Sequence, residues 1–260
     1  MPRSHRLSGG RRLTRAERGG PQASESEVVS VIVESERLNE LGNLWEQIEP
    51  PEIVAAALDM FGARITIASA FGLEDVALIH MATQVSHGPV DVFCLDTGVL
   101  FEETYALLEK FSECYPIRLR RLVPDLSLDA QAERHGAQLW ARDPDLCCKL
   151  RKVAPLQRAL EGYAAWVTGL RRAQGPTRQG AKAIERDAKH DLYKVNPLVR
   201  WSDEELWAYV RSENVPYNPL HEQGFPSIGC THCTRAVAPG EDQRAGRWAG
   251  FAKTECGLHL

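Results

Sequence analysis

Five of the seven cysteines, two pairs and one single residue, occupy positions that suit metal or thiol chemistry. Cys147 and Cys148 are adjacent, Cys230 and Cys233 enclose two residues, and Cys256 stands alone near the C-terminus. The two pairs supply four thiolates, the number that a tetrahedral zinc ion or a four-iron cluster needs. Structural zinc sites usually separate paired cysteines by about two to four residues. Adjacent cysteines do not fit that spacing, so the pattern favours an iron–sulfur cluster.

Two other interpretations of these cysteines remain open. The adjacent pair could be buried apolar residues and the Cys-x-x-Cys pair a redox dithiol, or the four thiolates could hold zinc in a sensor or interaction module without catalysis. Cys94 and Cys114 lie within apolar runs, so we assign them to the core. An odd number of clustered cysteines does not suit a secreted disulfide framework and favours a reducing compartment, the cytoplasm.

Cys256 is the candidate nucleophile. It follows a stretch that contains Gly246 and Gly250, so we expect residues 241–260 to form a mobile tail that carries the thiol to a substrate. The neighbouring carboxylate of Glu255 should disfavour the ionised form of the thiol, so reactivity requires cations nearby. The basic residues that could serve are Lys152, Arg244, Arg247 and His259.

Further basic residues follow the adjacent cysteines and a predicted strand. An arginine can bind phosphate or sulfate through two parallel hydrogen bonds. One such residue alone is more often a solvated surface charge, but their grouping favours an anion site. These residues are Arg151, Arg171, Arg172 and Arg178.

The net charge bears on the class of partner. It is −4 overall, and residues 1–20, with six arginines and one glutamate, contribute +5 of it, so the rest of the chain carries −9. A negative charge of this size disfavours nucleic acid and favours a small anion. We expect residues 1–27 to be a disordered leader, with an organelle transit peptide as the alternative. No apolar run reaches the roughly 18 to 20 residues of a membrane helix, so we expect a soluble protein.

Short apolar or β-branched runs alternate with helical patterns in the part of the chain that must position these residues. This alternation is typical of a parallel sheet, here of five or six strands, in one domain over residues 28–240. The expected strands cover 65–68, 90–95, 117–123, 165–170 and two short pieces within 182–198. The expected helices cover 28–47, a segment starting near Pro50, 74–85, 102–114, 148–160 and 202–212.

Two of the expected strand ends carry polar residues suited to a nucleotide. Ser69 and Gly72 stand between the first strand and the next helix, where backbone amides can bind phosphate oxygens. The alternative is that this glycine serves only the turn. The second strand ends at Leu95, followed by Asp-Thr-Gly, at the edge where open α/β sheets bind ligands. Two polar strand ends at one crevice favour a nucleotide.

Together these features resemble the assimilatory adenylyl-sulfate (APS) reductases, relatives of the PAPS reductases with the adenine-nucleotide alpha-hydrolase-like (PP-loop/HUP-type) fold. The resemblance covers residues 40–259, and its most specific parts are the two cysteine pairs and the motif Glu-Cys-Gly-Leu-His at 255–259. It implies a doubly wound, mostly parallel sheet followed by an irregular, cysteine-bearing C-terminal segment. The other matching segments are 69–75, 95–98, 147–152, 168–171 and 239–247.

The resemblance also implies roles for particular residues. One [4Fe-4S] cluster, which would tune the local field without passing electrons, would be ligated by Cys147, Cys148, Cys230 and Cys233. The phosphosulfate would be contacted by Lys152, Arg244 and Arg247. The nucleoside would be held by Arg178 and the backbone near Leu95, and the remaining substrate contacts would come from Ser69, Gly72 and His259.

The implied reaction begins when the Cys256 thiolate attacks the sulfur of APS, which releases AMP and leaves an S-sulfocysteine on the enzyme. Thioredoxin or a similar dithiol then releases sulfite. The presence of both cysteine pairs argues for APS over PAPS as the substrate. The family includes homo-oligomers, so the resemblance leaves self-association open.

A second enzyme class shares this fold, the cluster-containing ATP pyrophosphatases that thiolate tRNA. Their loop usually has the sequence Ser-Gly-Gly-x-Asp-Ser, whereas the segment 69–75 lacks the second glycine and the final serine. The acidic globular part also does not suit tRNA. The non-enzymatic alternative is the zinc module described above, which a brown protein and AMP release from APS would exclude.

Overall fold

The computed structural model describes residues 25–253 and 255–258 of the chain. The chain divides into two compact units, residues 1–37 and 38–260. Helix α1 (Glu25–Trp45) begins in the first unit and ends in the second. Of the leader expected over 1–27, residues 1–24 lie outside the described residues. Residues 25–27 belong to α1. All the candidate functional residues belong to the second unit.

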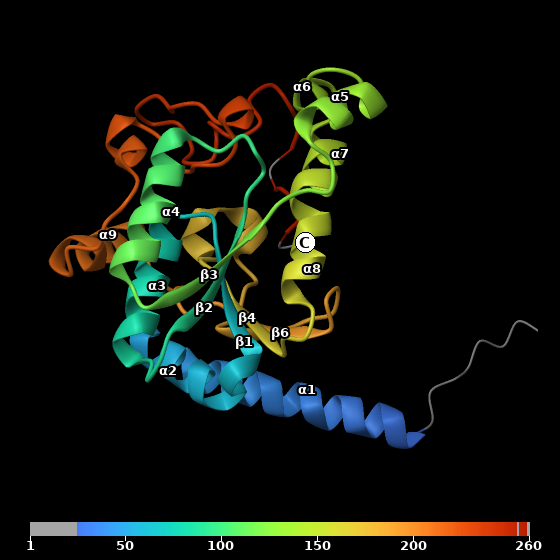
Figure 1. Ribbon diagram of the computed structural model, residues 1–260. Helices are drawn as coiled ribbons and strands as arrows, with labels where there is room; N and C mark the ends of the chain where they lie inside the picture. Colours follow the sequence, from blue (N-terminus) through green and yellow to red (C-terminus); the bar gives the residue numbers. More distant parts are fainter. Residues whose placement is uncertain (1–24, 254, 259–260) are drawn as a thin grey trace, which may run out of the picture. The chain divides into compact units, whose positions relative to one another are not determined.

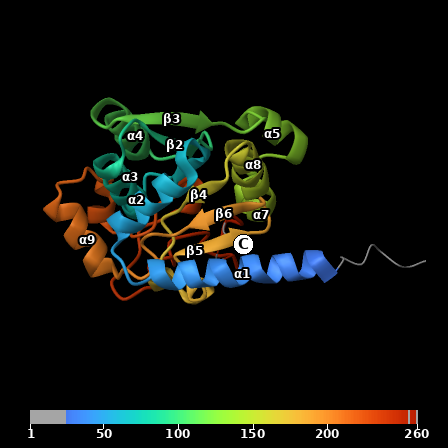
Figure 2. The same cartoon turned by 90° about the horizontal axis from the view of Figure 1, so that it is seen from below.

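A six-stranded sheet forms the centre of the second unit, in the order β3-β2-β1-β4-β6-β5. The first five strands in this order run parallel, and β5 pairs antiparallel with β6. Figure 2 shows the strands following one another from β3 to β5. The mostly parallel sheet is therefore confirmed. The strands are β1 (Ile65–Ser69), β2 (Val90–Leu95), β3 (Ile117–Leu122), β4 (Ala165–Val167), β5 (Ile184–Asp187) and β6 (Leu192–Val195).

Helices cover both faces of the sheet, as Figures 1 and 2 show. One face carries α2 (Pro50–Phe61), α3 (Leu73–Val85), α4 (Glu102–Cys114) and α9 (Asp203–Ser212). The other carries α8 (Ala154–Leu160) and α7 (Pro144–Cys148). Successive residues of β2 serve the two faces in turn, because side chains alternate along a strand. Val92 packs in the core under α3, and Phe93 packs against Leu156 of α8. The doubly wound arrangement is thus confirmed.

Two of these helices begin at the residues that the sequence indicates. Ser202 accepts a hydrogen bond from the Glu205 amide at 3.2 Å, and the Glu205 carboxylate accepts one from the Ser202 amide at 2.7 Å. This reciprocal pair satisfies two amides that have no partner within the helix. Pro50 begins α2, a position where its missing N–H does no harm.

The segment that carries the adjacent cysteines differs from the expected single helix over 148–160. It is helical from Pro144 to Leu160, but residues 149–153 form a π-helical turn. Pro155 explains the wider turn, because it has no N–H for the Arg151 carbonyl and its ring would press against that carbonyl in an α-helix. Single π turns occur frequently at functional sites. Short helices α5 (Leu128–His135) and α6 (Leu139–Arg142), which were not expected, precede this segment.

The two cysteines assigned to the core differ in their burial. Cys94 is fully buried in β2, as expected. The assignment of Cys114 was wrong, because its side chain is exposed at the last position of α4. The buried residues of α4 end with Phe111, and Cys114 is not among them. Among the described helices none has the length and hydropathy that crossing a bilayer requires.

Candidate active site and cysteine cavity

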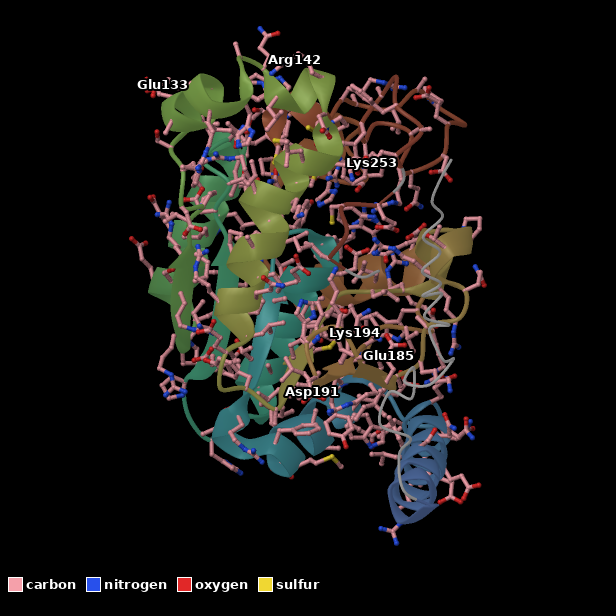
Figure 3. The ribbon with its side chains drawn as sticks, turned by 90° about the vertical axis from the view of Figure 1, so that its right-hand side faces the viewer. Glu133, Arg142, Glu185, Asp191, Lys194 and Lys253 are labelled. Carbon is pink, nitrogen blue, oxygen red and sulfur yellow. The ribbon has the colours of Figure 1, made fainter. Side chains whose placement is uncertain are left out.

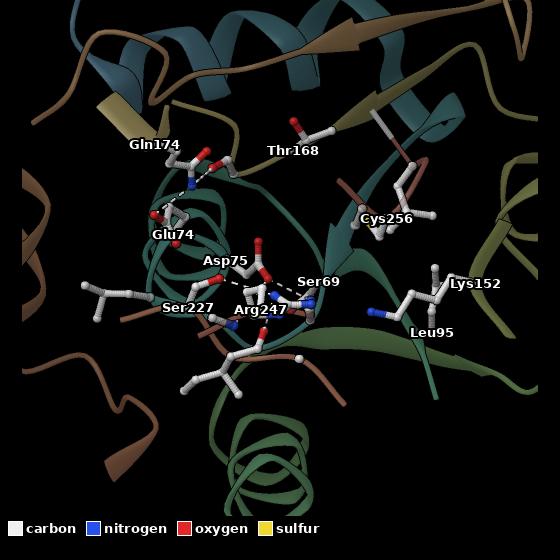
Figure 4. A pocket seen from close by; sticks show the side chains of 18 of the residues that line it. Ser69, Glu74, Asp75, Leu95, Lys152, Thr168, Gln174, Ser227, Arg247 and Cys256 are labelled. Carbon is white, nitrogen blue, oxygen red and sulfur yellow. Dashed lines mark hydrogen bonds between the residues drawn. The ribbon is translucent and has the colours of Figure 1, made fainter. Parts of the chain in front are cut away.

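A pocket opens at the carboxyl ends of β1, β2 and β4 (Figure 4). From β1 the sheet continues through β2 and β3 on one side and through β4 and β6 on the other. Open α/β sheets bind ligands at such a topological switch point. Figure 1 shows the C-terminal segment, drawn in red, at this end of the sheet.

Nearly all the predicted substrate contacts meet in this pocket. The residues that line it include Ser69, Gly72, Leu95, Lys152, Arg178, Arg244, Arg247 and Cys256. They come from the ends of β1 and β2, the π-helical turn, the short helix Pro176–Arg178 and the C-terminal segment, which are distant in sequence. His259 lies outside the described residues. Basic groups and the candidate nucleophile therefore share one pocket, although their roles remain predictions.

The β1–α3 loop uses its amides in a way that the sequence did not reveal. The amides of Ala70 and Gly72 donate to Oδ2 of Asp75 at 2.7 and 3.3 Å, and the Phe71 amide donates to Oγ of Ser69 at 3.1 Å. Phe71, with φ of 57°, takes the left-handed conformation, and Gly72 does not. Because these three amides have internal acceptors, an anion bound here would depend mainly on side chains.

The four paired cysteines line a second, smaller cavity beside the pocket. Cys147 and Cys148 come from α7, and Cys230 and Cys233 from the loop around the short helix 231–233. Burial first, and the neighbouring thiols next, raise the pKa of Cys147 to about 11. The same causes raise the pKa of Cys233 to about 11. Within residues 25–253 and 255–258, no group of three acidic, histidine or cysteine side chains is arranged to hold a single metal ion.

The Asp-Thr-Gly turn after β2 positions the Cys-x-x-Cys loop. Thr97 Oγ1 lies 3.3 Å from Sγ of Cys230, and the Thr231 amide donates to the Val99 carbonyl at 2.9 Å. Buried Arg151 holds the turn from the other side by donating to the Thr97 carbonyl at 2.6 Å. Arg151 therefore supports the structure around the cysteines, which sequence reasoning missed.

An aromatic pair lies over the cysteine cavity. The rings of Trp140 and His232 are stacked with their centroids 4.1 Å apart and their planes 9° apart, and both residues line the cavity. Trp140 belongs to α6, one of the helices that were not expected. The stack thus joins two segments that are 92 positions apart in sequence.

Lys152 and Arg247 line both cavities. Burial alone would lower the pKa of the Lys152 ammonium, but the neighbouring thiols, Cys230 and Cys256 foremost, raise it above its ordinary value. Arg247 donates to Oγ of Ser227 at 3.2 Å and lies over the Trp248 ring at 4.6 Å. Lys152 therefore stays protonated between the paired cysteines and the candidate nucleophile.

Not every basic residue singled out in the sequence serves the pocket. Arg171 pairs with Glu74 and Asp203, both at 2.7 Å, and Arg172 pairs with Glu46 at 2.6 Å. The buried Arg171 instead ties α3 to the start of α9. These two arginines hold the scaffold together.

The sequence predicts that Glu255 disfavours the thiolate of Cys256 unless cations lie nearby, and two arginines lie on its carboxylate. Its carboxylate is buried and accepts hydrogen bonds from Arg178 at 2.8 and 2.9 Å and from Arg244 at 3.2 Å. These arginines offset its negative charge. Sequence reasoning missed this pairing because Arg178 and Glu255 are 77 residues apart.

The doubly wound sheet with a pocket at its switch point, together with its similarity to a solved PAPS reductase, places the fold in the PP-loop/HUP-type class. The family model described as the phosphoadenosine phosphosulfate reductase domain matches residues 64–236. The chain belongs to this family, and the resemblance noted in the sequence is confirmed.

Several known proteins are similar to the chain over most of its length. The adenosine 5'-phosphosulfate reductase of Shouchella clausii is 46% identical over 80% of this chain and 86% of its own length. The phosphoadenosine 5'-phosphosulfate reductase of Gloeobacter violaceus is 44% identical over 87% of this chain and 95% of its own length. The crystal structure of a PAPS reductase from Candida auris in complex with phosphate is 29% identical, with a TM-score of 0.68, and covers 84% of this chain and 100% of that one.

Proposed function

We propose that the protein reduces adenosine 5'-phosphosulfate to sulfite and AMP in assimilatory sulfate reduction, with Cys256 as the nucleophile. The observation that carries this proposal is that Cys256 shares one pocket with Lys152, Arg244 and Arg247 at the nucleotide-binding edge of the sheet. The names of similar proteins, which include APS reductases, support the same reaction.

The pocket's positive charge suits the first step. The attacking thiolate, the sulfonate and the departing phosphate are all anionic, so fixed cations must offset their mutual repulsion. Sγ of Cys256 forms a bond to the sulfonate sulfur while the bond from that sulfur to the bridging phosphate oxygen breaks. The bonding electron pair leaves with AMP, and Cys256 becomes S-sulfocysteine. Lys152 and Arg247 line the pocket with Cys256, where they would bind the phosphosulfate.

A dithiol protein of the thioredoxin type completes the reaction. One of its thiolates attacks Sγ of Cys256, and sulfite leaves with the electron pair of the sulfur–sulfur bond. The second thiol then resolves the mixed disulfide and restores the Cys256 thiol. The dithiol thus supplies both electrons of the reduction. Since this chemistry needs reduced thiols, we place the protein in the cytoplasm.

The remaining predicted contacts belong to the nucleotide. Ser69, Gly72 and Leu95 line the pocket at the ends of β1 and β2, where a nucleoside would lie. Arg178 lines the same pocket. We keep His259, outside the described residues, as a proposed contact contributed by the tail. Both cysteine pairs favour APS over PAPS, although two of the similar proteins carry the PAPS name.

The four paired cysteines fit a [4Fe-4S] cluster. All four line one cavity, and a four-iron cluster takes four thiolate ligands. When bound, it would supply an electrostatic field beside Lys152. Because burial raises the pKa of Cys147 and Cys233, iron binding would displace protons.

The proposal is tested by incubating the purified protein anaerobically with stoichiometric APS and no reductant. Intact mass and tryptic mapping should show a gain of about 80 Da, the mass of a sulfonate, on the peptide that contains Cys256. PAPS in a parallel incubation tests the choice of substrate. If neither compound gives an adduct while the iron content is intact, the proposed reaction is wrong.

The pH dependence of nucleotide binding should reveal Asp75, which lines the pocket. Burial raises the pKa of Asp75 to about 7, although the hydrogen bond from the Ala70 amide stabilises the charged carboxylate and acts in the opposite direction. The carboxyl is therefore neutral below pH 7 and repels an anion above it. Between pH 6 and 8 we expect the affinity for AMP to fall by roughly threefold to tenfold more in the wild type than in Asp75→Asn.

Isothermal titration with AMP at both pH values would measure this effect. The second ionisation of the AMP phosphate, with a pKa of about 6, affects both proteins equally, so the comparison cancels it. The asparagine Oδ1 can still accept the loop amides, which keeps the loop in place. Equal pH profiles for the two proteins would show that Asp75 does not titrate in this range.

A further inference from the structure

The described residues of the tail are attached to the body of the protein on both sides of Cys256. Before it, Lys253 (labelled in Figure 3) pairs with Asp145 of α7. After it, the Gly257 carbonyl accepts a hydrogen bond from Nζ of Lys189 at 2.9 Å. Leu258 packs with the core cluster of Trp166 and its neighbours. The thiol thus lies in a docked segment.

Glu255 makes the most buried of these attachments. In its ion pair with Arg178, the Glu255 side chain is 5% exposed and the Arg178 side chain 9% exposed. Both carboxylate oxygens take part, which fixes the orientation of the carboxylate as well as its position. Thr177 donates to the same carboxylate at 3.2 Å, and Arg244 adds a second guanidinium.

Arg178 is itself held rigidly. It donates to the Gln174 side chain, whose amide group donates to Glu74 of α3 at 2.9 Å. Glu74 in turn accepts a hydrogen bond from buried Arg171 at 2.7 Å. A satisfied polar network of this kind resists rearrangement, so Arg178 gives Glu255 a fixed anchor.

The cations of the pocket thus fall into two groups. Arg178 and Arg244 hold the carboxylate of Glu255, whereas Lys152 and Arg247 lie beside both the pocket and the cysteine cavity. Figure 4 shows Cys256 and Lys152 on the same side of the pocket. When Arg178 and Arg244 bind the carboxylate of Glu255, the neighbouring thiol of Cys256 therefore lies near Lys152 and Arg247.

We propose that Glu255 is a positioning residue: its carboxylate, bound by Arg178 and Arg244, fixes the tail so that Cys256 faces Lys152 in the pocket. The inference rests on the nucleophilic role of Cys256 proposed above. Arg178 then acts as the anchor of the tail in addition to its expected contact with the nucleoside. Removing the charge of Glu255 would take the carboxylate partner away from the buried Arg178 and release the tail.

Thiol labelling tests the inference without any substrate. Full-length protein, purified anaerobically, is treated with N-ethylmaleimide, quenched and digested with trypsin, and labelling of the peptide after Lys253 is followed over time. We expect Glu255→Gln to label Cys256 at least about tenfold faster than the wild type, because the docked tail no longer shields the thiol. Glu255→Asp, which keeps the charge, should give an intermediate rate.

Glu46→Gln is the matched control. Glu46 accepts two hydrogen bonds from Arg172, at 2.6 and 3.1 Å, outside the pocket lining. Cys256 in the Glu46→Gln variant should be labelled at the wild-type rate. An equal rise in this control would mean general loosening and would overturn the inference, as would a wild-type rate in Glu255→Gln. Should Glu255→Gln fail to fold, a wild-type rate in Glu255→Asp decides against the inference.

Measurements of AMP affinity and of the single-turnover rate of sulfonate transfer distinguish the positioning of Cys256 by Glu255 from a general effect on the pocket. In Glu255→Gln we expect transfer of the sulfonate from APS to slow by about tenfold or more, while the affinity for AMP changes less than about threefold. AMP should not speed labelling in the wild type. A parallel loss of AMP affinity, or faster wild-type labelling with AMP, would show that Glu255 does not serve to position the tail. Absence of any sulfonate adduct in the wild type would instead refute the proposed reaction and leave the labelling result standing.

Discussion

Cys256→Ser should lose sulfite formation by at least about 10⁴-fold, because a serine hydroxyl is a far weaker nucleophile than a thiolate at neutral pH. The substitution changes one atom in a docked segment, so the pocket and its cations should persist. AMP affinity and iron content should therefore equal those of the wild type. Sulfite release with thioredoxin as the reductant, measured beside AMP binding, checks both expectations.

Cys114→Ser is the control for this experiment. Cys114 is an exposed thiol at the end of α4 and is absent from the pocket lining, so its loss should leave the rate unchanged. Normal sulfite formation by Cys256→Ser would mean that another group attacks the substrate. The proposed covalent intermediate would then have to be abandoned.

Cys147→Ala should lose the iron of the proposed cluster. A four-iron cluster needs four protein ligands, and Cys147 is one of the four cysteines that line the cavity. We expect the iron content to fall from about four atoms per chain to less than about one, with loss of the brown absorbance near 400 nm. Metal analysis and the visible spectrum of anaerobically purified protein measure this directly.

Cys94→Ala offers a matched comparison, because Cys94 is a buried cysteine within the core and away from the cysteine cavity. Burial raises the pKa of Cys94 to about 12, which keeps it a protonated thiol. This variant should keep its iron. Full iron content in Cys147→Ala, or zinc in the purified wild type, would contradict the assignment of these cysteines to an iron–sulfur cluster.

Local patterns in the sequence predicted the sheet well. The β-branched run at 90–95 coincides with β2, and Ser202 with Glu205 marks the start of α9, because each signal acts within a few residues. The π-helical turn at 149–153 was missed, since the effect of Pro155 depends on whether the helix continues past it. Cys114 was misplaced because an apolar neighbourhood does not show which side of a helix faces the core.

The site was predicted by residue type more than by arrangement. Basic residues and cysteines indicated an anion pocket and a metal site, and the fold brings most of them together. Which arginine meets which carboxylate could not be read from the sequence. The charge next to Cys256 seemed unfavourable until the fold placed Arg178 beside it, because such pairings depend on long-range packing.

The two outer strands of the sheet bear on how the protein avoids self-aggregation. An outer strand has unpaired backbone groups that can recruit a strand from another molecule. β3 carries Arg118, Arg120 and Arg121, and the opposite outer strand, β5, carries Glu185 and Arg186. An incoming apolar strand would have to displace or desolvate these charges. The sheet can therefore stay open at both ends, as a doubly wound fold requires, without acting as a template for fibrils.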